Sequence, residues 1–104
     1  MAWIYLTLAG ILEVVWAFYM KQSDGFTKPL ASFVTIITMI ASFALLSMAM
    51  KTLPLSISYT IWTGIGTVGA FLVGLIILGE PTNTMQIIAA VMIVIGLFMM
   101  KLSS

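Results

Sequence analysis

The sequence predicts an all-α membrane protein with four transmembrane helices per chain, and three observations support that prediction. Hydrophobic residues make up 62% of the 104 positions and charged residues only 7%, whereas a soluble domain carries about 25% charged residues. The apolar residues gather in four runs, each close to the roughly 20 residues that a helix needs to cross a bilayer. The short alternating segments of a transmembrane β-barrel are not seen. A single transmembrane domain over residues 1–104 is therefore expected.

The first expected span, residues 2–20, is an apolar run that ends at Lys21 and contains one charge, Glu13. Because this run has no basic N-terminal segment and no small-residue cleavage site, it is not expected to be a signal peptide. Residues 21–29 are polar and contain Gly and Pro, which is typical of a loop. The second expected span, residues 30–50, carries no charge.

The third expected span, residues 54–79, follows a polar break at Lys51 and starts with Pro54, which suits the first turn of a helix. The fourth, residues 83–101, follows a second polar break. The side chains there that can cap a helix are Thr82, Asn83 and Thr84. Connections this short make sequential helices antiparallel neighbours.

The composition also excludes several classes of function. Cysteine and histidine are both absent, which excludes disulfides, thiolate nucleophiles, imidazole catalysis and the usual zinc sites. We therefore expect no enzyme, no metal and no cofactor. The net charge of +1 offers no electrostatic reason to bind nucleic acid.

The lysine count does not orient the chain in the membrane. Cytoplasmic loops normally carry the excess of Lys and Arg. Four spans put both termini on one side, together with Lys51 and Lys101. The other side holds Lys21 and Lys28, so the count is two against two. Two interpretations stay open: other signals select one orientation, or the chain inserts both ways and pairs with an inverted copy.

Glu13 is the one charged residue well inside an expected span. A charge in the middle of a membrane helix costs roughly 2.5–3.5 kcal/mol on insertion scales, and such a residue marks a functional site by default. No basic residue inside a span can pair with it. A carboxylate that is either protonated or bound to a cation is the minimal device for exchanging protons for cations. A structural Glu hydrogen-bonded between helices is the competing interpretation.

The residues around Glu13 predict a cation site. Gly10, Trp16 and Ala17 lie three or four positions from Glu13 and share its helix face. Further candidates occupy the middle of the second span and one face of the third; they are Ser42, Tyr59, Trp62, Thr63 and Gly66. Aromatic rings around a carboxylate suit a cation, because charge pairing and cation–π attraction act together. Each aromatic residue taken alone is more often a packing residue.

The third span is rich in glycine, and Gly64 and Gly66 lie near its centre. Small residues let membrane helices approach closely, while clustered glycines can also mark a bend. Close packing and a helix bend at these two residues both stay open.

Together these residues resemble the small multidrug resistance family over essentially the full chain. The similar features are four short spans, the single Glu of the first span, and the segment Tyr-Thr-Ile-Trp-Thr-Gly-Ile-Gly at residues 59–66. Residues 10–17, Gly-Ile-Leu-Glu-Val-Val-Trp-Ala, are similar to the guanidinium exporter (Gdx) branch. The drug-exporting branch usually has Gly-Thr in place of this Trp-Ala. Lys-Leu-Ser at residues 101–103 agrees with the guanidinium branch.

The resemblance implies a proton-coupled antiporter in the bacterial inner membrane that exports guanidinium and small substituted guanidinium ions. It implies an antiparallel homodimer of dual topology, in which both copies of Glu13 face one central site and bind either protons or the cation. Four matching positions would bind or frame Glu13 and its ligand: Trp16, Ser42, Tyr59 and Trp62. The expected partners are the cation, protons, the lipid bilayer and a second copy of the chain.

The third span departs from the family pattern Pro-x-Gly-Thr-Ala-Tyr-Ala-x-Trp. Ser56, Ser58 and Thr60 stand where the family has Gly or Ala, and Thr60 flanks Tyr59, so we expect it to line the site. Two alternatives of the same class stay open: a quaternary ammonium or multidrug exporter, and one half of a heterodimeric pair. A passive cation channel and an accessory membrane subunit are alternatives of a different class.

Overall fold

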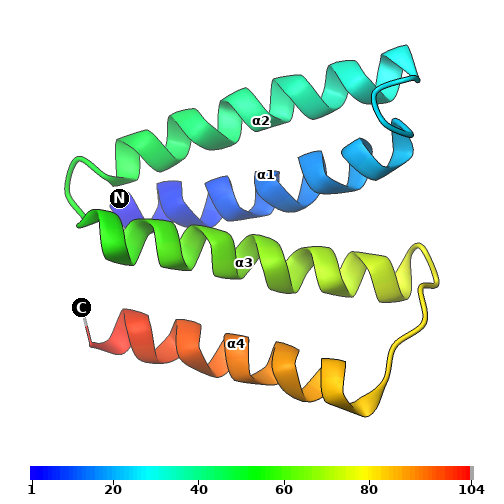
Figure 1. Ribbon diagram of the computed structural model, residues 1–104. Coiled ribbons are helices and arrows are strands. Elements are labelled where there is room, and N and C mark those ends of the chain that lie inside the picture. Colours follow the sequence, from blue (N-terminus) through cyan, green and yellow to red (C-terminus); the bar gives the residue numbers. More distant parts are fainter. Residues whose placement is uncertain (104) are drawn as a thin grey trace.

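The computed structural model describes residues 1–103 and contains four helices, each antiparallel to the one before it (Figure 1). The helices are α1 (Ala2–Gln22), α2 (Pro29–Ala49), α3 (Leu55–Ile76) and α4 (Thr84–Leu102). All four are long and apolar enough to cross a membrane. No strand occurs among the described residues, so the predicted all-α membrane protein is confirmed.

Two helix ends follow local backbone geometry rather than the limits of the apolar runs. α3 ends at Ile76, short of the predicted end at Gly79. Gly79 has a φ of +66°, a left-handed conformation that stops a helix and that glycine adopts without strain. α4 starts after Asn83, whose side-chain oxygen accepts a hydrogen bond of 2.9 Å from the backbone N–H of Gln86. Pro54 is the N-cap residue of α3 and lies just before its first turn.

The connection between α1 and α2 starts later than predicted. α1 continues past residue 20 to Gln22, because Lys and Gln are good helix formers. The chain then turns at Ser23, whose buried hydroxyl donates a hydrogen bond of 2.7 Å to the carbonyl of Met20. The same oxygen accepts a hydrogen bond of 3.1 Å from the N–H of Phe26. Pro29 then opens α2 in its first turn.

The helices form a flat layer rather than a closed bundle. α1 packs against both α2 and α3, whereas the backbone of α4 packs along α3, and α4 reaches α1 through the Lys101 ammonium, which lies 5.4 Å from the ring centroid of Trp3. The layer measures 40 × 34 × 16 Å along its principal axes. Figure 1 shows both termini and the α2–α3 connection at one end of the layer, and the other two connections at the opposite end.

The buried apolar core of this layer is small. Among residues 1–103 it consists of six side chains from α1, α2 and α3: Leu6, Ala9, Leu46, Ala49, Ile61 and Trp62. α4 buries no residue. Large apolar side chains are therefore exposed along every helix, a surface that would be a liability in water but that suits a surrounding of lipid or of a second protein chain.

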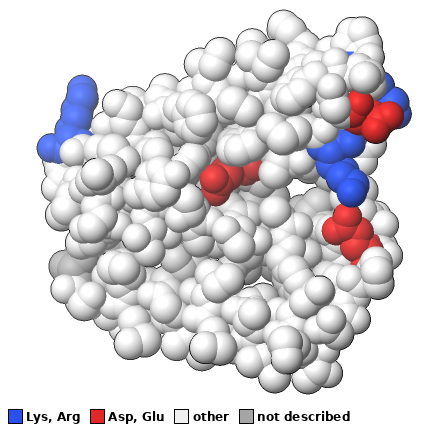
Figure 2. Space-filling view, viewed as in Figure 1, with Lys and Arg blue, Asp and Glu red and all other residues white. Residues whose placement is uncertain are grey.

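Formal charges lie at the two ends of the layer, with one exception. Figure 2 shows basic and acidic side chains at the edges of the molecule and further acidic atoms in the middle of the visible face. At the end that holds the α1–α2 and α3–α4 connections, Lys21 and Glu80 form an ion pair of 3.5 Å between exposed side chains. The exception is Glu13, which lies inside α1.

Candidate functional site

Glu13 lies near the middle of α1. At a rise of 1.5 Å per residue, it lies about 17 Å from the start of the helix and about 14 Å from its end. Because the hydrocarbon core of a bilayer is about 30 Å thick, the carboxylate lies close to the membrane midplane. Its Oε1 atom is buried and has no hydrogen-bond partner among residues 1–103. Leaving such an acceptor without a donor is unfavourable, more so for a charged group.

The backbone of α3 passes directly over this carboxylate at Gly66. A Cβ atom at position 66 would overlap the Oε1 and carboxyl carbon of Glu13. Inside a helix the backbone N–H of Gly66 already donates within its own helix, so α3 approaches the carboxylate closely without offering it a donor. Gly66 therefore provides space for the Glu13 carboxylate, and a larger residue there would require the Glu13 side chain to move.

Further glycines bring the neighbouring helices into close contact. A Cβ atom at Gly10 would lie 2.6 Å from the Cγ2 atom of Ile65, so α1 and α3 approach closely at this point. A Cβ atom at Gly64 would overlap Leu97, which brings α4 against α3. α3 runs as an α-helix through both Gly64 and Gly66. These glycines therefore serve close helix packing, and a bend at this point stays a prediction.

Ser42 joins three helices next to the Glu13 face. Its side chain is fully buried and donates a hydrogen bond of 2.7 Å to the backbone carbonyl of Ala9, one turn before Glu13. The same oxygen accepts a hydrogen bond of 3.0 Å from the indole N–H of Trp62. The predicted residues Ser42 and Trp62 are therefore brought together, but Ser42 positions the indole and does not bond the carboxylate.

Trp62 is the centre of an aromatic cluster. The ring centroids of Tyr59 and Phe43 lie 5.5 Å and 5.7 Å from that of Trp62. Phe43 was not among the predicted site residues. Its position next to Ser42, in a helix without charges, could have indicated that it lies near the site. Tyr59 is 51% exposed, so one side of the cluster is open at the surface of this chain.

Trp16 is the other predicted residue of α1, one helical turn after Glu13. Its indole N–H is buried and has no hydrogen-bond partner within the described chain. An unused donor and an unused acceptor thus lie one turn apart on the same face of α1. The two groups need opposite partners, because the Glu13 oxygen lacks a donor and the Trp16 indole lacks an acceptor.

Thr60 and Thr63 lie on the side of α3 that faces α4. They line a groove of about 370 Å³ between these two helices, together with Gly64 and Thr67. The hydroxyl of Thr63 donates a hydrogen bond of 2.7 Å to the carbonyl of Tyr59 within its own helix. Within one chain, these two predicted lining residues therefore belong to the α3–α4 groove.

Comparison with known proteins assigns the chain to a family. Residues 1–95 match the family model described as Small Multidrug Resistance protein. Proteins named guanidinium exporter from Escherichia coli (strain K12), Citrobacter freundii and Salmonella typhimurium are each 47% identical to it over 104 residues. These matches cover 100% of this chain and 99% of each relative.

The fold and the matches define a multi-pass transport protein of the bacterial inner membrane. The chain belongs to the small multidrug resistance family. The resemblance inferred from its sequence motifs is therefore confirmed.

We expect Ser42→Ala to destabilise the protein by about 1–3 kcal/mol, because the buried indole N–H of Trp62 loses its acceptor. Unfolding of the purified protein in mixed micelles, followed by circular dichroism, measures this change. Ser32→Ala is the matched control in the same helix, since the exposed Ser32 hydroxyl bonds only the carbonyl of Lys28. Equal stability of the two variants would contradict the three-helix role of Ser42.

We expect Gly66→Ala to destabilise the protein by roughly 1–3 kcal/mol, because the added methyl group overlaps the Glu13 carboxylate. A double-mutant cycle measures the coupling. In a Glu13→Ala background the space is free, and alanine is the better helix former, so the same substitution should be neutral or stabilising. The same cost in both backgrounds would show that Gly66 is needed for a reason other than the carboxylate.

Proposed function

We propose that this protein exports guanidinium and small substituted guanidinium ions in exchange for protons, with both ions competing for Glu13. The observation that carries the proposal is the buried Oε1 atom of Glu13, which lacks a hydrogen-bond partner among residues 1–103. Lysine residues lie only near the helix ends and in the connections, so none is available at the membrane midplane. The carboxylate is therefore neutral when protonated and needs a cation from outside the chain when it is ionised.

Guanidinium has the chemistry that this surrounding favours. It is planar and delocalised, its N–H groups match a carboxylate in a two-bond arrangement, and it is more weakly hydrated than an ammonium ion. Its flat face also suits an aromatic surface, which the cluster of Tyr59, Trp62 and Phe43 supplies. Tyr59 is half exposed, so its ring is available to a cation that reaches Glu13.

The relatives support the same substrate. The similar proteins from Escherichia coli and Salmonella typhimurium are named guanidinium exporter and align over the whole chain. Because the match covers 100% of this chain, it includes the segment around Glu13. The family and its relatives therefore support a transport function for this chain rather than an enzymatic one.

The working unit that we propose is an antiparallel homodimer with one central site. A single chain is a flat layer with a small core, so the Tyr59 side of the aromatic cluster remains open. A second copy would cover this side and bring a second Glu13 to the site. The two-against-two lysine count gives neither orientation an advantage under the positive-inside rule.

Transport in reconstituted vesicles tests the exchange. A guanidinium gradient imposed across vesicles loaded with a pH indicator should drive proton movement in the opposite direction. Glu13→Gln should abolish both guanidinium flux and proton movement, because the amide neither ionises nor balances a cation. Asp24→Asn is the matched control: it removes a loop carboxylate at a residue with a φ of +50°, a conformation that asparagine tolerates.

Three results would contradict the proposal. Guanidinium flux without proton movement would indicate a channel, and proton-coupled flux only of a bulky quaternary ammonium ion would indicate a multidrug exporter. An absence of any flux unless a second, different chain is added would indicate one half of a heterodimeric pair or an accessory subunit.

We expect a reporter fused to the C-terminus to be found on both sides of the membrane in comparable amounts, because the lysines are balanced between the two ends. Accessibility of a single cysteine at the C-terminus to an impermeant thiol reagent, in sealed inverted and right-side-out vesicles, measures this distribution. Adding two lysines to the α1–α2 loop should shift the population to one orientation. Labelling from one side only in the unmodified chain would contradict dual topology.

A further inference from the structure

An ion pair joins α1 to the α3–α4 connection at the membrane surface. The ammonium group of Lys21, in the last turn of α1, lies 3.5 Å from the Oε2 atom of Glu80. Glu80 follows the end of α3 and lies outside the membrane-spanning helices. A cavity of about 150 Å³ lies at the interface of α1 and α3, and the side chains of both residues line it. A surface carboxylate therefore borders an internal space.

Small residues face one another across this cavity. Its lining includes Ala17 on α1, and Ala70 and Gly74 on α3. A cavity needs roughly 10–15 Å³ to hold one water molecule, so this one has room for a small planar ion and part of its hydration shell. At its inner end the lining includes Val14, the residue that follows Glu13.

The cavity leads from the membrane surface toward the level of Glu13. α1 and α3 run in the same direction, because each helix is antiparallel to the one before it (Figure 1). Lys21 lies eight residues after Glu13 on α1. On α3, Gly74 contacts Glu80 and lies eight residues after Gly66, which contacts Glu13. At the rise of an α-helix both separations are about 12 Å, so the two carboxylates are about 12 Å apart along one helix interface.

The position of Glu80 does not depend on Lys21. The backbone N–H of Glu80 donates a hydrogen bond of 2.9 Å to the carbonyl of Gly74. A Cβ atom at Gly74 would overlap the Oε1 atom of Glu80. The carboxylate therefore packs on the end of α3 whichever cation is bound to it.

The ion pair itself is easily exchanged. The side chains of Lys21 and Glu80 are 66% and 46% exposed, and ion pairs this exposed are weak. The Lys21 ammonium contacts one oxygen of the carboxylate, whereas a guanidinium ion can form two parallel hydrogen bonds with both oxygens. A guanidinium ion therefore competes well with Lys21 for this carboxylate.

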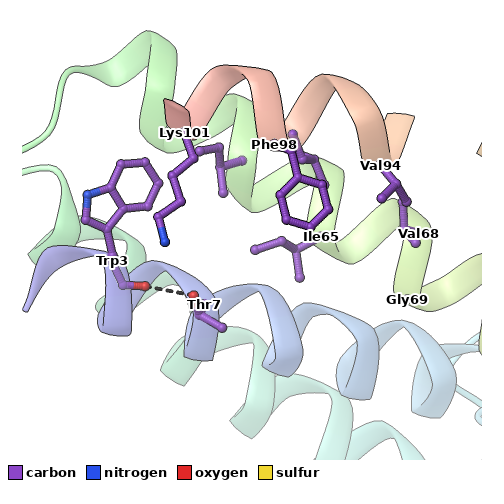
Figure 3. A pocket seen from close by; sticks show the side chains of 10 residues that line it. Trp3, Thr7, Ile65, Val68, Gly69, Val94, Phe98 and Lys101 are labelled. Carbon is purple, nitrogen blue, oxygen red and sulfur yellow. Dashed lines mark hydrogen bonds between the residues drawn. The ribbon is translucent and has the colours of Figure 1, made fainter. Parts of the chain in front are cut away.

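The opposite end of the α1–α3 interface has no such carboxylate. There the ammonium group of Lys101 lies 5.4 Å from the ring centroid of Trp3 (Figure 3). The cleft beside them, of about 390 Å³, has apolar walls that include Val94 and Phe98 (Figure 3). None of the ten residues that line this cleft is acidic. Of the two cavities, the one beside Glu80 is therefore the one that suits a cation.

We propose that Glu80 is an outer binding site for the cation that Glu13 transports, and that the cation displaces Lys21 from it. This role rests on the proposed function, since the same cation binds at both carboxylates. From Glu80 the cation enters the cavity and reaches Glu13 when the Val14 side chain moves aside. Lys21 then returns to Glu80. A weak outer site suits transport, because an ion that binds too tightly does not leave.

Two variants that break the same ion pair test the outer site, because they should act in opposite directions. Initial rates of guanidinium uptake into reconstituted vesicles are measured over a range of guanidinium concentrations at fixed pH. Glu80→Gln should lower kcat/KM by about two- to five-fold, and Lys21→Gln should raise it by a similar factor because the carboxylate is freed. kcat should stay unchanged in both. An ion pair with only a structural role would shift both variants in the same direction, and that result would overturn the proposal.

Asp24→Asn and Lys28→Gln are the matched controls. They remove one charge of each sign at the same end of the layer, outside the cavity, and should leave kcat/KM unchanged. Shifts as large as those of Glu80→Gln and Lys21→Gln would show that general surface charge sets the rate, and would overturn the outer site. The proposed function would survive that result, because the unmodified chain would still exchange guanidinium for protons.

Binding to the Glu13→Gln variant tests the outer site without transport. The backbone amide signals of Gly74 and Gly79 are followed by NMR in micelles, as guanidinium chloride is compared with sodium chloride at equal concentration. We expect a saturable shift with guanidinium that Glu80→Gln removes. The absence of a guanidinium-specific shift would overturn the outer site whether or not the unmodified chain transports guanidinium.

Discussion

A carboxylate at the midplane of a bilayer is stable only when it is protonated or paired, and this chain brings no cationic side chain within reach of Glu13. α3 approaches the carboxylate at Gly66. The backbone N–H and carbonyl groups of Gly66 already form hydrogen bonds within α3. The close approach excludes lipid from one side of the carboxylate but satisfies none of its acceptor capacity. In the proposed exchange, the interaction that completes the site comes from outside the described chain, because no described residue bonds the Oε1 atom.

The flat arrangement of the helices places α4 beside α3 rather than against the middle of α1, which carries Glu13. A closed four-helix bundle would surround Glu13 with its own helices and bury it permanently. Here the backbone of α4 packs along α3, and the buried apolar side chains of the described residues come from the other three helices. The bridge from Trp62 through Ser42 to the Ala9 carbonyl holds these three helices at the level of the carboxylate. The hydrogen bonds that join three helices therefore lie next to the site. The exposed apolar side chains of the helices remain available to lipid or to a second chain.

The sequence predicted the helices, and it singled out Glu13 as the candidate site residue, because both inferences depend on local composition. A run of about 20 apolar residues must become a helix in lipid, and an isolated charge within it stands out without any tertiary information. The end of α3 was misjudged because the left-handed conformation of Gly79 stops the helix inside an apolar run. The partner of Ser42 and the position of Thr63 in the α3–α4 groove depend on how helices rotate against one another. That rotation is set by the glycine contacts between helices, which no single span reveals.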